Sequence, residues 1–244
     1  MPLTFAHPAV ILPLNYLPKR WLSLTGLIVG SVVPDFEYFI RMKVYSIYSH
    51  TWFGLIWFDL PLAFVLTFVY HNIVRDMLIS NSPRVLHSRL SIYKGFNWNN
   101  YAKKNSLVVI ISILIGAVSH LFWDSFTHEN GYFVVTFNMT RQVSVLGLYL
   151  PLYKVIQHLS TLTGGVAILI VIFTLKKISG QPQNNILRYW VMVVAVVVSI
   201  LALRIAVGLS ITQYPNLIVT ALSGFITGLI LVPVILKSDK QVFS

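Results

Sequence analysis

Long apolar stretches separated by short polar connections dominate this chain. A helix needs about 20 apolar residues to cross the hydrocarbon core of a bilayer. The backbone of each such stretch must be helical, because lipid offers it no hydrogen-bond partners. We therefore predict an all-α integral membrane protein with about six transmembrane helices, over Trp21–Ile40, Trp52–His71, Leu107–Thr127, Thr161–Leu175, Tyr189–Ile211 and Asn216–Leu236.

The first 18 residues follow a different pattern, with prolines at positions 2, 8, 13 and 18. The nearest cations come after the apolar stretch, whereas a signal peptide carries them before it, so we do not expect a cleavable signal. Pro8 favours the start of a short helix. We predict a short re-entrant helix that turns at Asn15–Lys19 and lies against the first full span, so that His7 can meet Asp35.

Composition supports a membrane protein and excludes several classes. Only 10% of the 244 residues are charged, against about a quarter in a typical soluble domain. The chain has no cysteine, which excludes thiol chemistry and Cys-based zinc sites. In a membrane protein, the net charge of +11 reflects topology and anionic headgroups, so we expect a membrane lipid as partner and no nucleic acid.

The cations also predict an orientation. The connection Asn72–Ser106 holds six Lys or Arg residues, which is typical of a cytoplasmic loop. The opposite ends of the spans are then extracytoplasmic.

Ionisable residues inside the predicted spans are few and gather near one end. His120, Asp124 and His128 are spaced four residues apart and therefore lie along one face of a helix. Imidazole and carboxylate groups at this spacing can share one divalent cation. The alternative for this pattern taken alone is an interfacial polar stripe.

Other segments bring further candidate ligands to the same depth. Asp35 follows Pro34, which fits the first residue of a restarted helix and leaves the carboxylate near a helix N-terminus. His50 lies just before the second span, on the same predicted side. Nitrogen and oxygen ligands without thiolate fit Zn²⁺, with Mn²⁺ or Fe²⁺ as alternatives, and this many ligands leave room for two metals. The predicted metal ligands are His7, Asp35, His50, His120 and Asp124.

Three further charged residues receive weaker interpretations. Glu37 points about 200° away from Asp35 on a helix, so we interpret it as a surface group or as a supporting group behind the ligands. Asp59 and Arg204 have compatible depths in their spans and are predicted to form a structural ion pair. The alternative is that Arg204 holds a substrate phosphate.

The remaining histidines fall into two groups. His128 and His158 are candidates for an outer metal ligand, a proton shuttle or an interfacial residue. His71 and His87 belong to the opposite, cytoplasmic side and are expected to be solvated.

Several of these residues occur in motifs that, taken in order, resemble a known family. The motifs are Met-Pro-Leu-Thr-Phe-Ala-His7-Pro-Ala, the segment from Gly30 with Pro34-Asp35, Ser49-His50-Thr51, Phe58-Asp59-Leu-Pro61, and His120-x3-Asp124-Ser-x-Thr-His128. Together they resemble the bacterial family called domain of unknown function 4184. That family is in turn similar to the membrane-bound, metal-dependent hydrolases of the inner membrane.

The resemblance implies a multi-pass helical protein of the bacterial inner membrane with a His/Asp metal site and a hydrolase activity. It carries the ligand role onto the five residues already named. The motifs cover about the first 130 residues. We therefore expect a single helical membrane domain, 1–244, with a metal-site half, 1–130, and three further spans, 131–244.

Three classes of function remain open at this point. The leading hypothesis is a metal-dependent hydrolase that cleaves an ester or phosphoester of a membrane lipid at the extracytoplasmic interface, with Asp124 or Asp35 accepting the proton. A transporter or ion conduit also uses charged residues and broken helices inside the membrane. A non-catalytic scaffold, in which a metal only staples the helices together, is the third.

Overall fold

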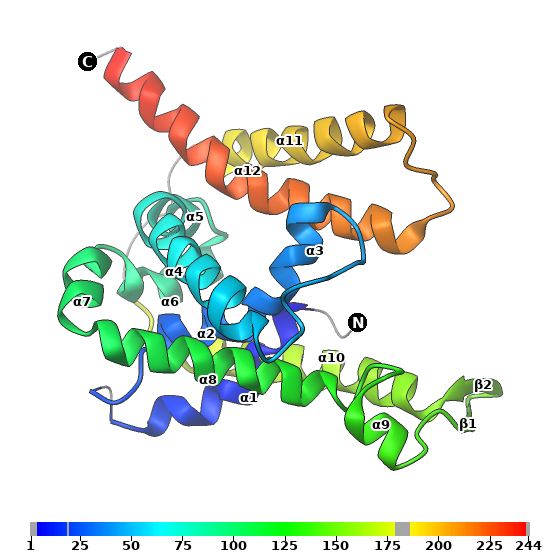
Figure 1. The fold of residues 1–244 in the computed structure, drawn as a ribbon. Helices are drawn as coiled ribbons and strands as arrows, with labels where there is room; N and C mark the ends of the chain where they lie inside the picture. The colour runs from blue at the N-terminus through cyan, green and yellow to red at the C-terminus, as the bar shows by residue number, and fades with distance from the viewer. Residues whose placement is uncertain (1–3, 19, 179–185, 243–244) are drawn as a thin grey trace. The chain divides into compact units, whose positions relative to one another are not determined.

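The computed structural model describes residues 4–18, 20–178 and 186–242 and is mostly helical (Figure 1). Lys19, part of the predicted N-terminal turn, lies outside these residues. The chain divides into two compact units. The first comprises Met1–Asp35, Tyr48–Phe64 and Lys104–Phe173, and the second comprises Phe36–Ile47, Val65–Lys103 and Thr174–Ser244.

Five helices in the described part of the chain are long and apolar enough to cross a membrane, which supports a membrane protein. The first is Leu55–Ser80, built from α4 (Leu60–Val69) and α5 (Arg75–Ser80) with two π-helical turns, Leu55–Asp59 and Tyr70–Val74. The other helices are α8 (Ser106–Asp124), α10 (Leu152–Thr174), α11 (Ile186–Ala206) and α12 (Tyr214–Val242, of which Tyr214–Lys237 qualifies).

The predicted first span, Trp21–Ile40, is not one continuous α-helix and is not among these five. It consists of α2 (Leu24–Val32), a 3₁₀ turn (Val33–Asp35) and α3 (Phe36–Arg41). Pro34 lies in the 3₁₀ turn, where its missing N–H interrupts the α-helical ladder. This interruption places Asp35 at the end of the turn.

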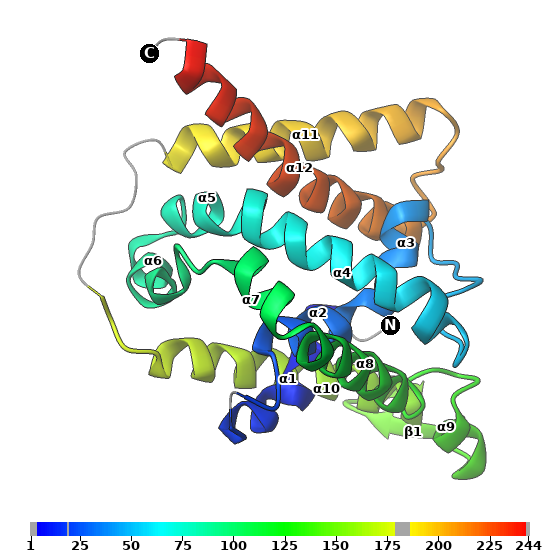
Figure 2. The ribbon, with the colours of Figure 1, turned by 60° about the vertical axis from the view of Figure 1, so that its left-hand side comes forward.

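In the first unit, α2 packs closely along α8 (Figures 1 and 2). Glycines on both helices permit the approach: a Cβ on Gly30 would clash with the carbonyl of Ile113, and a Cβ on Gly116 would clash with the carbonyl of Leu27. The amide of Ser23 also donates to Ser112 Oγ at 2.7 Å. The two helices that carry the predicted ligands are thus held at backbone contact.

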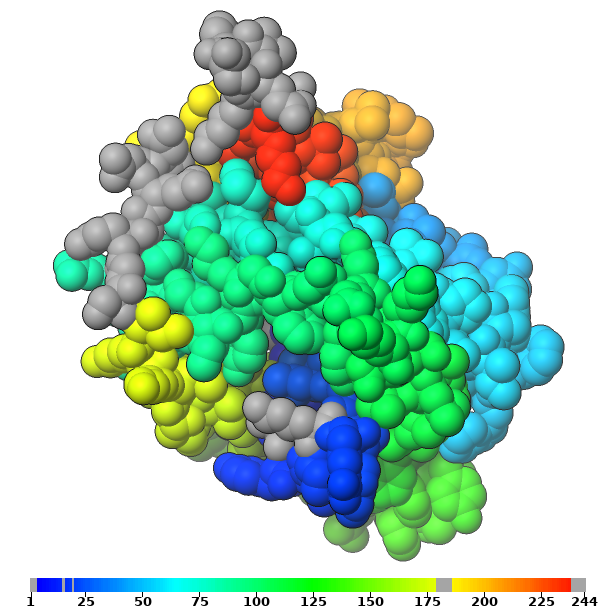
Figure 3. All heavy atoms as spheres, turned by 90° about the vertical axis from the view of Figure 1, so that its left-hand side faces the viewer, coloured from blue at the N-terminus to red at the C-terminus, as the bar shows by residue number. Residues whose placement is uncertain are grey.

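The N-terminal segment consists of short helical pieces: a 3₁₀ turn (Thr4–Ala6), α1 (Pro8–Ile11) and a second 3₁₀ turn (Leu12–Tyr16). The start of α1 at Pro8 agrees with the sequence prediction. The N-terminal segment is drawn in blue in the lower part of Figure 3, and Tyr16, at the end of the second 3₁₀ turn, is 93% exposed.

The segment between α8 and α10 contains a small β-hairpin, which the all-α prediction did not include. After α9 (Tyr132–Thr136), the strands β1 (Gln142–Val145) and β2 (Leu148–Pro151) pair antiparallel. Leu146 and Gly147 connect them with φ values of 53° and 81°. Two positive φ values in a two-residue loop match a type I′ turn, so the hairpin is a local feature set by its Leu-Gly turn.

In the second unit, α11 and α12 pack along each other (Figure 2). Tyr189, Val193 and Val232 form a buried cluster between them. The helix α3 also contacts α12, where Ser223 Oγ donates to the carbonyl of Phe39 at 2.8 Å. The remaining helices of this unit are α6 (Arg84–Leu90), a 3₁₀ turn (Ser91–Tyr93) and α7 (Trp98–Lys104).

The prediction that His71 and His87 are solvated is wrong. His71 is 9% exposed and stacks on Trp98 with ring centroids 4.7 Å apart, and His87 is 5% exposed. The connection predicted over Asn72–Ser106 instead folds back on its own helix, where Arg75 Nη1 donates to the carbonyl of Phe96 at 2.8 Å.

Candidate metal centre

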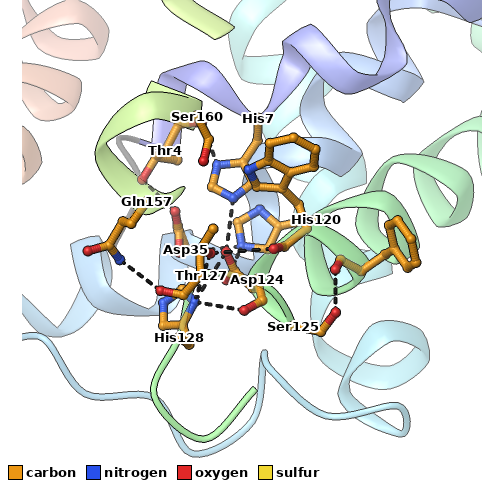
Figure 4. A network of polar contacts seen from close by, with 12 residues as sticks. Thr4, His7, Asp35, His120, Asp124, Ser125, Thr127, His128, Gln157 and Ser160 are labelled. Atoms are coloured by element: carbon orange, nitrogen blue, oxygen red, sulfur yellow. Dashed lines mark hydrogen bonds and ion pairs between the residues drawn. The ribbon is translucent and has the colours of Figure 1, made fainter. Parts of the chain in front are cut away.

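Four side chains of the first unit meet at the last turn of α8. His120 and Asp124 lie one helical turn apart, Asp35 ends the 3₁₀ turn after α2, and His50 lies in the turn before Leu55. One ligand atom from each residue lies within 4.8 Å of the others. Figure 4 shows Asp35, His120 and Asp124 pointing toward one another. This buried Asp/His/His/Asp group, called the metal-ligand cluster below, could hold a metal ion.

The separations within the metal-ligand cluster match a coordination sphere. His50 Nε2 lies 3.5 Å from Asp35 Oδ1 and 3.6 Å from Asp124 Oδ2. His120 Nε2 lies 3.6 Å from Asp35 Oδ1 and 3.2 Å from Asp124 Oδ2. In a tetrahedral site with bonds of about 2.1 Å, neighbouring ligand atoms lie about 3.4 Å apart.

Hydrogen bonds on the far side of the ligands orient them. His120 Nδ1 lies 2.8 Å from the carbonyl of Ser31, which can only accept, so Nδ1 carries the proton and Nε2 faces the cluster. Thr4 Oγ1 donates to Asp35 Oδ2 at 2.5 Å, which leaves Asp35 Oδ1 for the cluster. Within the described part of the chain, Asp35 Oδ1, His120 Nε2 and Asp124 Oδ2 are buried and make no hydrogen bond.

The turn that carries His50 is built by local sequence. Thr51 Oγ1 donates to the carbonyl of Tyr48 at 2.8 Å and accepts from the amide of Gly54 at 2.9 Å. A Cβ on Gly54 would run into the carbonyl of Tyr48, so only glycine fits this position. The turn therefore fixes His50 opposite α8.

No Lys or Arg among the described residues pairs with the two carboxylates of the cluster. Asp35 and Asp124 are 1% and 7% exposed, and among the described residues they form ion pairs only with histidines. Burial alone would lower the pKa of His50, but the neighbouring Asp124 and Asp35 carboxylates raise it above the usual value. Two buried carboxylates without Lys or Arg require positive charge, from protons on the imidazoles or from a metal ion.

His7 and His128 approach the other oxygen of Asp124. His7 Nε2 lies 3.1 Å from Asp124 Oδ1, and His128 Nδ1 lies 3.4 Å from the same atom (Figure 4). The ring of His7 also stacks on His120 with centroids 3.9 Å apart. Burial lowers the pKa of His128, although the Asp124 carboxylate acts in the opposite direction. The structure thus brings the five predicted ligands and His128 together in one unit.

The other predicted site residues have different surroundings. Glu37 is buried, pairs with Arg41 at 2.8 Å and accepts from the amide of Ile47 at 2.9 Å, so its interpretation as a surface group is wrong. Asp59 is fully buried in the first unit. Arg204 belongs to the second unit, where its Nη2 donates to the carbonyl of Met42 at 3.2 Å. The predicted ion pair between Asp59 and Arg204 stays a prediction.

Sequence reasoning missed the groups that support the ligands. Thr4 and the Ser31 carbonyl hold Asp35 and His120, and Gln157 Nε2 donates to the carbonyl of Thr127 at 3.2 Å. Thr4 lies three residues before His7 within the N-terminal motif Met-Pro-Leu-Thr-Phe-Ala-His7-Pro-Ala, so the sequence contained a signal for it. A backbone carbonyl such as that of Ser31 has no sequence signal, because every residue carries one.

Comparison with known proteins agrees with the motifs. No curated protein and no solved structure matches the chain at a significant level. The family described as Domain of unknown function (DUF4184) matches residues 1–234, which include every residue of the metal-ligand cluster as well as His7 and His128. The chain is therefore a member of the DUF4184 family.

Proposed function

We propose that this protein is a membrane-embedded, metal-dependent hydrolase that cleaves an ester or phosphoester bond of a membrane lipid. The observation that carries the proposal is the convergence of two buried carboxylates and three imidazoles, with ligand atoms 3.1–3.6 Å apart and no Lys or Arg paired with the carboxylates in the described part of the chain. We propose Zn²⁺ as the ion, with Mn²⁺ or Fe²⁺ as alternatives, because the donors are imidazole nitrogens and carboxylate oxygens.

The proposal includes a topology. The helices α2 and α3 with the intervening 3₁₀ turn would form a sixth, broken span, and the N-terminal segment would be re-entrant beside it. The basic connection Asn72–Ser106 would face the cytoplasm of a bacterial cell and the cluster would face outward from its inner membrane. The exposed aromatic rings of Trp52 and Phe53 beside His50 are typical of the membrane–water interface and support a cluster at that depth.

The residues of the cluster suit hydrolysis. A divalent ion held there supplies a Lewis acid for a phosphoryl or carbonyl oxygen and lowers the pKa of water. Asp124 is the better candidate for accepting the proton of the attacking water, because its two oxygens face different imidazoles and its side chain is 9% exposed against 1% for Asp35. The hydrogen bond from Thr4 holds Asp35 Oδ2 and favours a ligand role for Asp35.

The test is turnover of a defined lipid by the purified protein in nanodiscs that contain phosphatidylglycerol. This lipid carries both acyl esters and a phosphodiester, so mass spectrometry of the products identifies the bond that breaks. We expect turnover that stops with EDTA and returns with Zn²⁺ or Mn²⁺. Asp124→Asn should lower the rate by about 100-fold or more, as expected when a general base is removed.

His158→Ala is the matched control, because His158 is an exposed histidine of the same unit that lies outside the cluster. It should leave turnover unchanged. Metal-loaded protein that cleaves no ester or phosphoester bond in a panel of bilayer lipids would overturn the hydrolase proposal. In that case, a lower melting temperature after chelation identifies a metal-stapled scaffold, and ion flux that persists without metal identifies a conduit.

A further inference from the structure

The two carboxylate oxygens of Asp124 face two different sets of imidazole nitrogens. Oδ2 lies 3.2 Å from His120 Nε2 and 3.6 Å from His50 Nε2. Oδ1 lies 3.1 Å from His7 Nε2 and 3.4 Å from His128 Nδ1. The carboxylate thus lies between the metal-ligand cluster and a second set of donors, which we call the outer set: His7, His128 and Asp124 Oδ1.

The contacts of His7 in the outer set require an additional positive charge. The ring of His7 lies between two acceptors: Nδ1 is 3.3 Å from the carbonyl of Thr4, and Nε2 is 3.1 Å from Asp124 Oδ1. A neutral imidazole has one N–H and can donate to only one of them. The other contact requires a second proton on His7 or, at Asp124 Oδ1, a cation beside both atoms.

His128 adds an independent observation. Its Nε2 is buried and makes no hydrogen bond to any of the residues that the structure describes. Its Nδ1 lies 3.4 Å from Asp124 Oδ1 and 3.3 Å from the backbone carbonyl of Asp124, which can only accept. Nδ1 therefore carries the ring proton of neutral His128, and Nε2 is the nitrogen that can bind an ion. At 32% side-chain exposure, His128 is also the most open of the histidines around Asp124. The outer set therefore offers donors on a side that solvent reaches.

The number of protein ligands differs between the two sets. The metal-ligand cluster supplies four, which fills a tetrahedral ion, and closed sites of this kind are typical of structural zinc. The outer set supplies three, and three protein ligands with one open position are typical of catalytic zinc. Pairs of metal ions about 4 Å apart are common in enzymes that cleave phosphoesters.

We propose that Asp124 bridges two divalent ions: an inner ion held by Asp35, His50 and His120, and an outer ion held by His7 and His128 with a position open to substrate. This inference rests on the proposed function and deepens it. It places the chemistry at the outer ion and makes Asp124 a bridging ligand in place of the proton acceptor. It also names the phosphoester rather than the acyl ester as the substrate class, because two ions can stabilise both the attacking and the leaving oxygen of a phosphoryl group.

The test counts ions without using activity. The full-length protein, purified in detergent and reconstituted with Mn²⁺, is measured for metal content by mass spectrometry and for electron paramagnetic resonance. We expect about two equivalents and the multiline spectrum of an exchange-coupled pair. His7→Ala and His128→Ala should each retain about one equivalent with the uncoupled six-line spectrum, and the retained inner ion shows that the variant is folded. His158→Ala should keep both ions and the coupling.

Each other outcome is decisive. One equivalent in the unmodified protein overturns the outer ion and leaves the proposed function standing, whereas no equivalent overturns both. Two coupled ions retained in His7→Ala and in His128→Ala would show that the outer set is not a ligand set. Loss of both ions in each of these variants would overturn the division into an inner and an outer ion.

Discussion

Two clusters of charged and polar side chains, one around the buried Arg75 and one around the buried Asp124, differ in how charge is balanced. In the second unit, Arg75 donates to His71 Nδ1 at 2.7 Å, to Asp76 Oδ1 at 2.7 Å and to the carbonyl of Phe96 at 2.8 Å. One permanent cation meets one carboxylate. In the first unit, Asp35 and Asp124 meet only imidazoles among the described residues.

The comparison shows why burial of polar groups alone does not identify a site. Arg75 uses its planar set of donors to tie the Phe96 segment to its own helix, which is a structural task. Among the described residues, the cluster around Asp124 contains no arginine or lysine. Its buried oxygen and nitrogen atoms, such as Asp124 Oδ2 and His120 Nε2, face one another without a hydrogen bond. The positive charge beside its carboxylates must come from protons on the imidazoles or from a metal ion.

The largest expected effect comes from removing metal. Ligand binding to the folded state stabilises it by about 4 kcal/mol when the free ligand is about 1,000 times its dissociation constant. We expect EDTA to lower the melting temperature and to increase hydrogen exchange at the C-terminal end of α8, with no change around Arg75. In a His120→Ala/Asp124→Ala variant, EDTA should change neither quantity. Equal increases in hydrogen exchange at both clusters would contradict the claim that only the cluster around Asp124 binds metal.

The next effect concerns the second cluster. Arg75→Ala removes four charge-assisted hydrogen bonds, including those to His71 and to the Phe96 carbonyl, so we expect a loss of about 3 kcal/mol in the free energy of unfolding. Metal content should not change. Arg84→Ala, at an exposed position, is the control and should have little effect. Loss of metal in Arg75→Ala would show that the two clusters are not independent.

A smaller effect tests the placement of His7. A Cβ on Gly164 would lie 2.9 Å from the carbonyl of Ala6, whereas a Cβ on Gly165 would meet nothing within 4 Å. We expect Gly164→Val to displace the N-terminal segment, to destabilise the protein by about 2 kcal/mol and to weaken metal binding. Gly165→Val is the matched control on the same helix. Thermal unfolding and metal titration are measured for both variants. Equal melting temperatures and equal metal affinities would contradict close packing of α10 on the N-terminal segment.

The smallest effect tests the hydrogen bond to Asp35. Thr4→Val removes the donor to Asp35 Oδ2, and loss of such a supporting bond typically lowers metal affinity by about 10- to 100-fold. We expect a change near the lower end, about tenfold, or about 1.4 kcal/mol in binding free energy. Thr4→Ser retains the hydroxyl and should keep the affinity. Unchanged affinity in Thr4→Val would remove Thr4 from the metal site.

The local part of the site and much of the fold could be predicted from the sequence. The spacing of His120 and Asp124 is a property of one helix, and Pro34 marks the break before Asp35, so both could be predicted. The depth argument also brought His50 and His7 to the same place. Long apolar runs predicted helices because bilayer thickness sets their length.

The rest depends on contacts that no local pattern records. Which oxygen of Asp124 faces which imidazole follows from the approach of three separate segments, and the Ser31 carbonyl reaches His120 only because glycines bring α2 and α8 together. The burial of His71 depends on Trp98, which is distant in sequence and folds back onto it. The hairpin is set locally by the turn at Leu146 and Gly147, but this short turn lies between long apolar runs that predict only helices.

Metal analysis of the purified protein tests the central claim most directly. Three proteins are compared after identical purification without added chelator: the unmodified chain, His120→Ala/Asp124→Ala from the metal-ligand cluster, and His71→Gln/Asp76→Asn from the second cluster. The account predicts at least one equivalent of a divalent metal in the first and third and close to none in the second. An unmodified protein without stoichiometric metal, or a His120→Ala/Asp124→Ala variant that keeps it, would contradict the account.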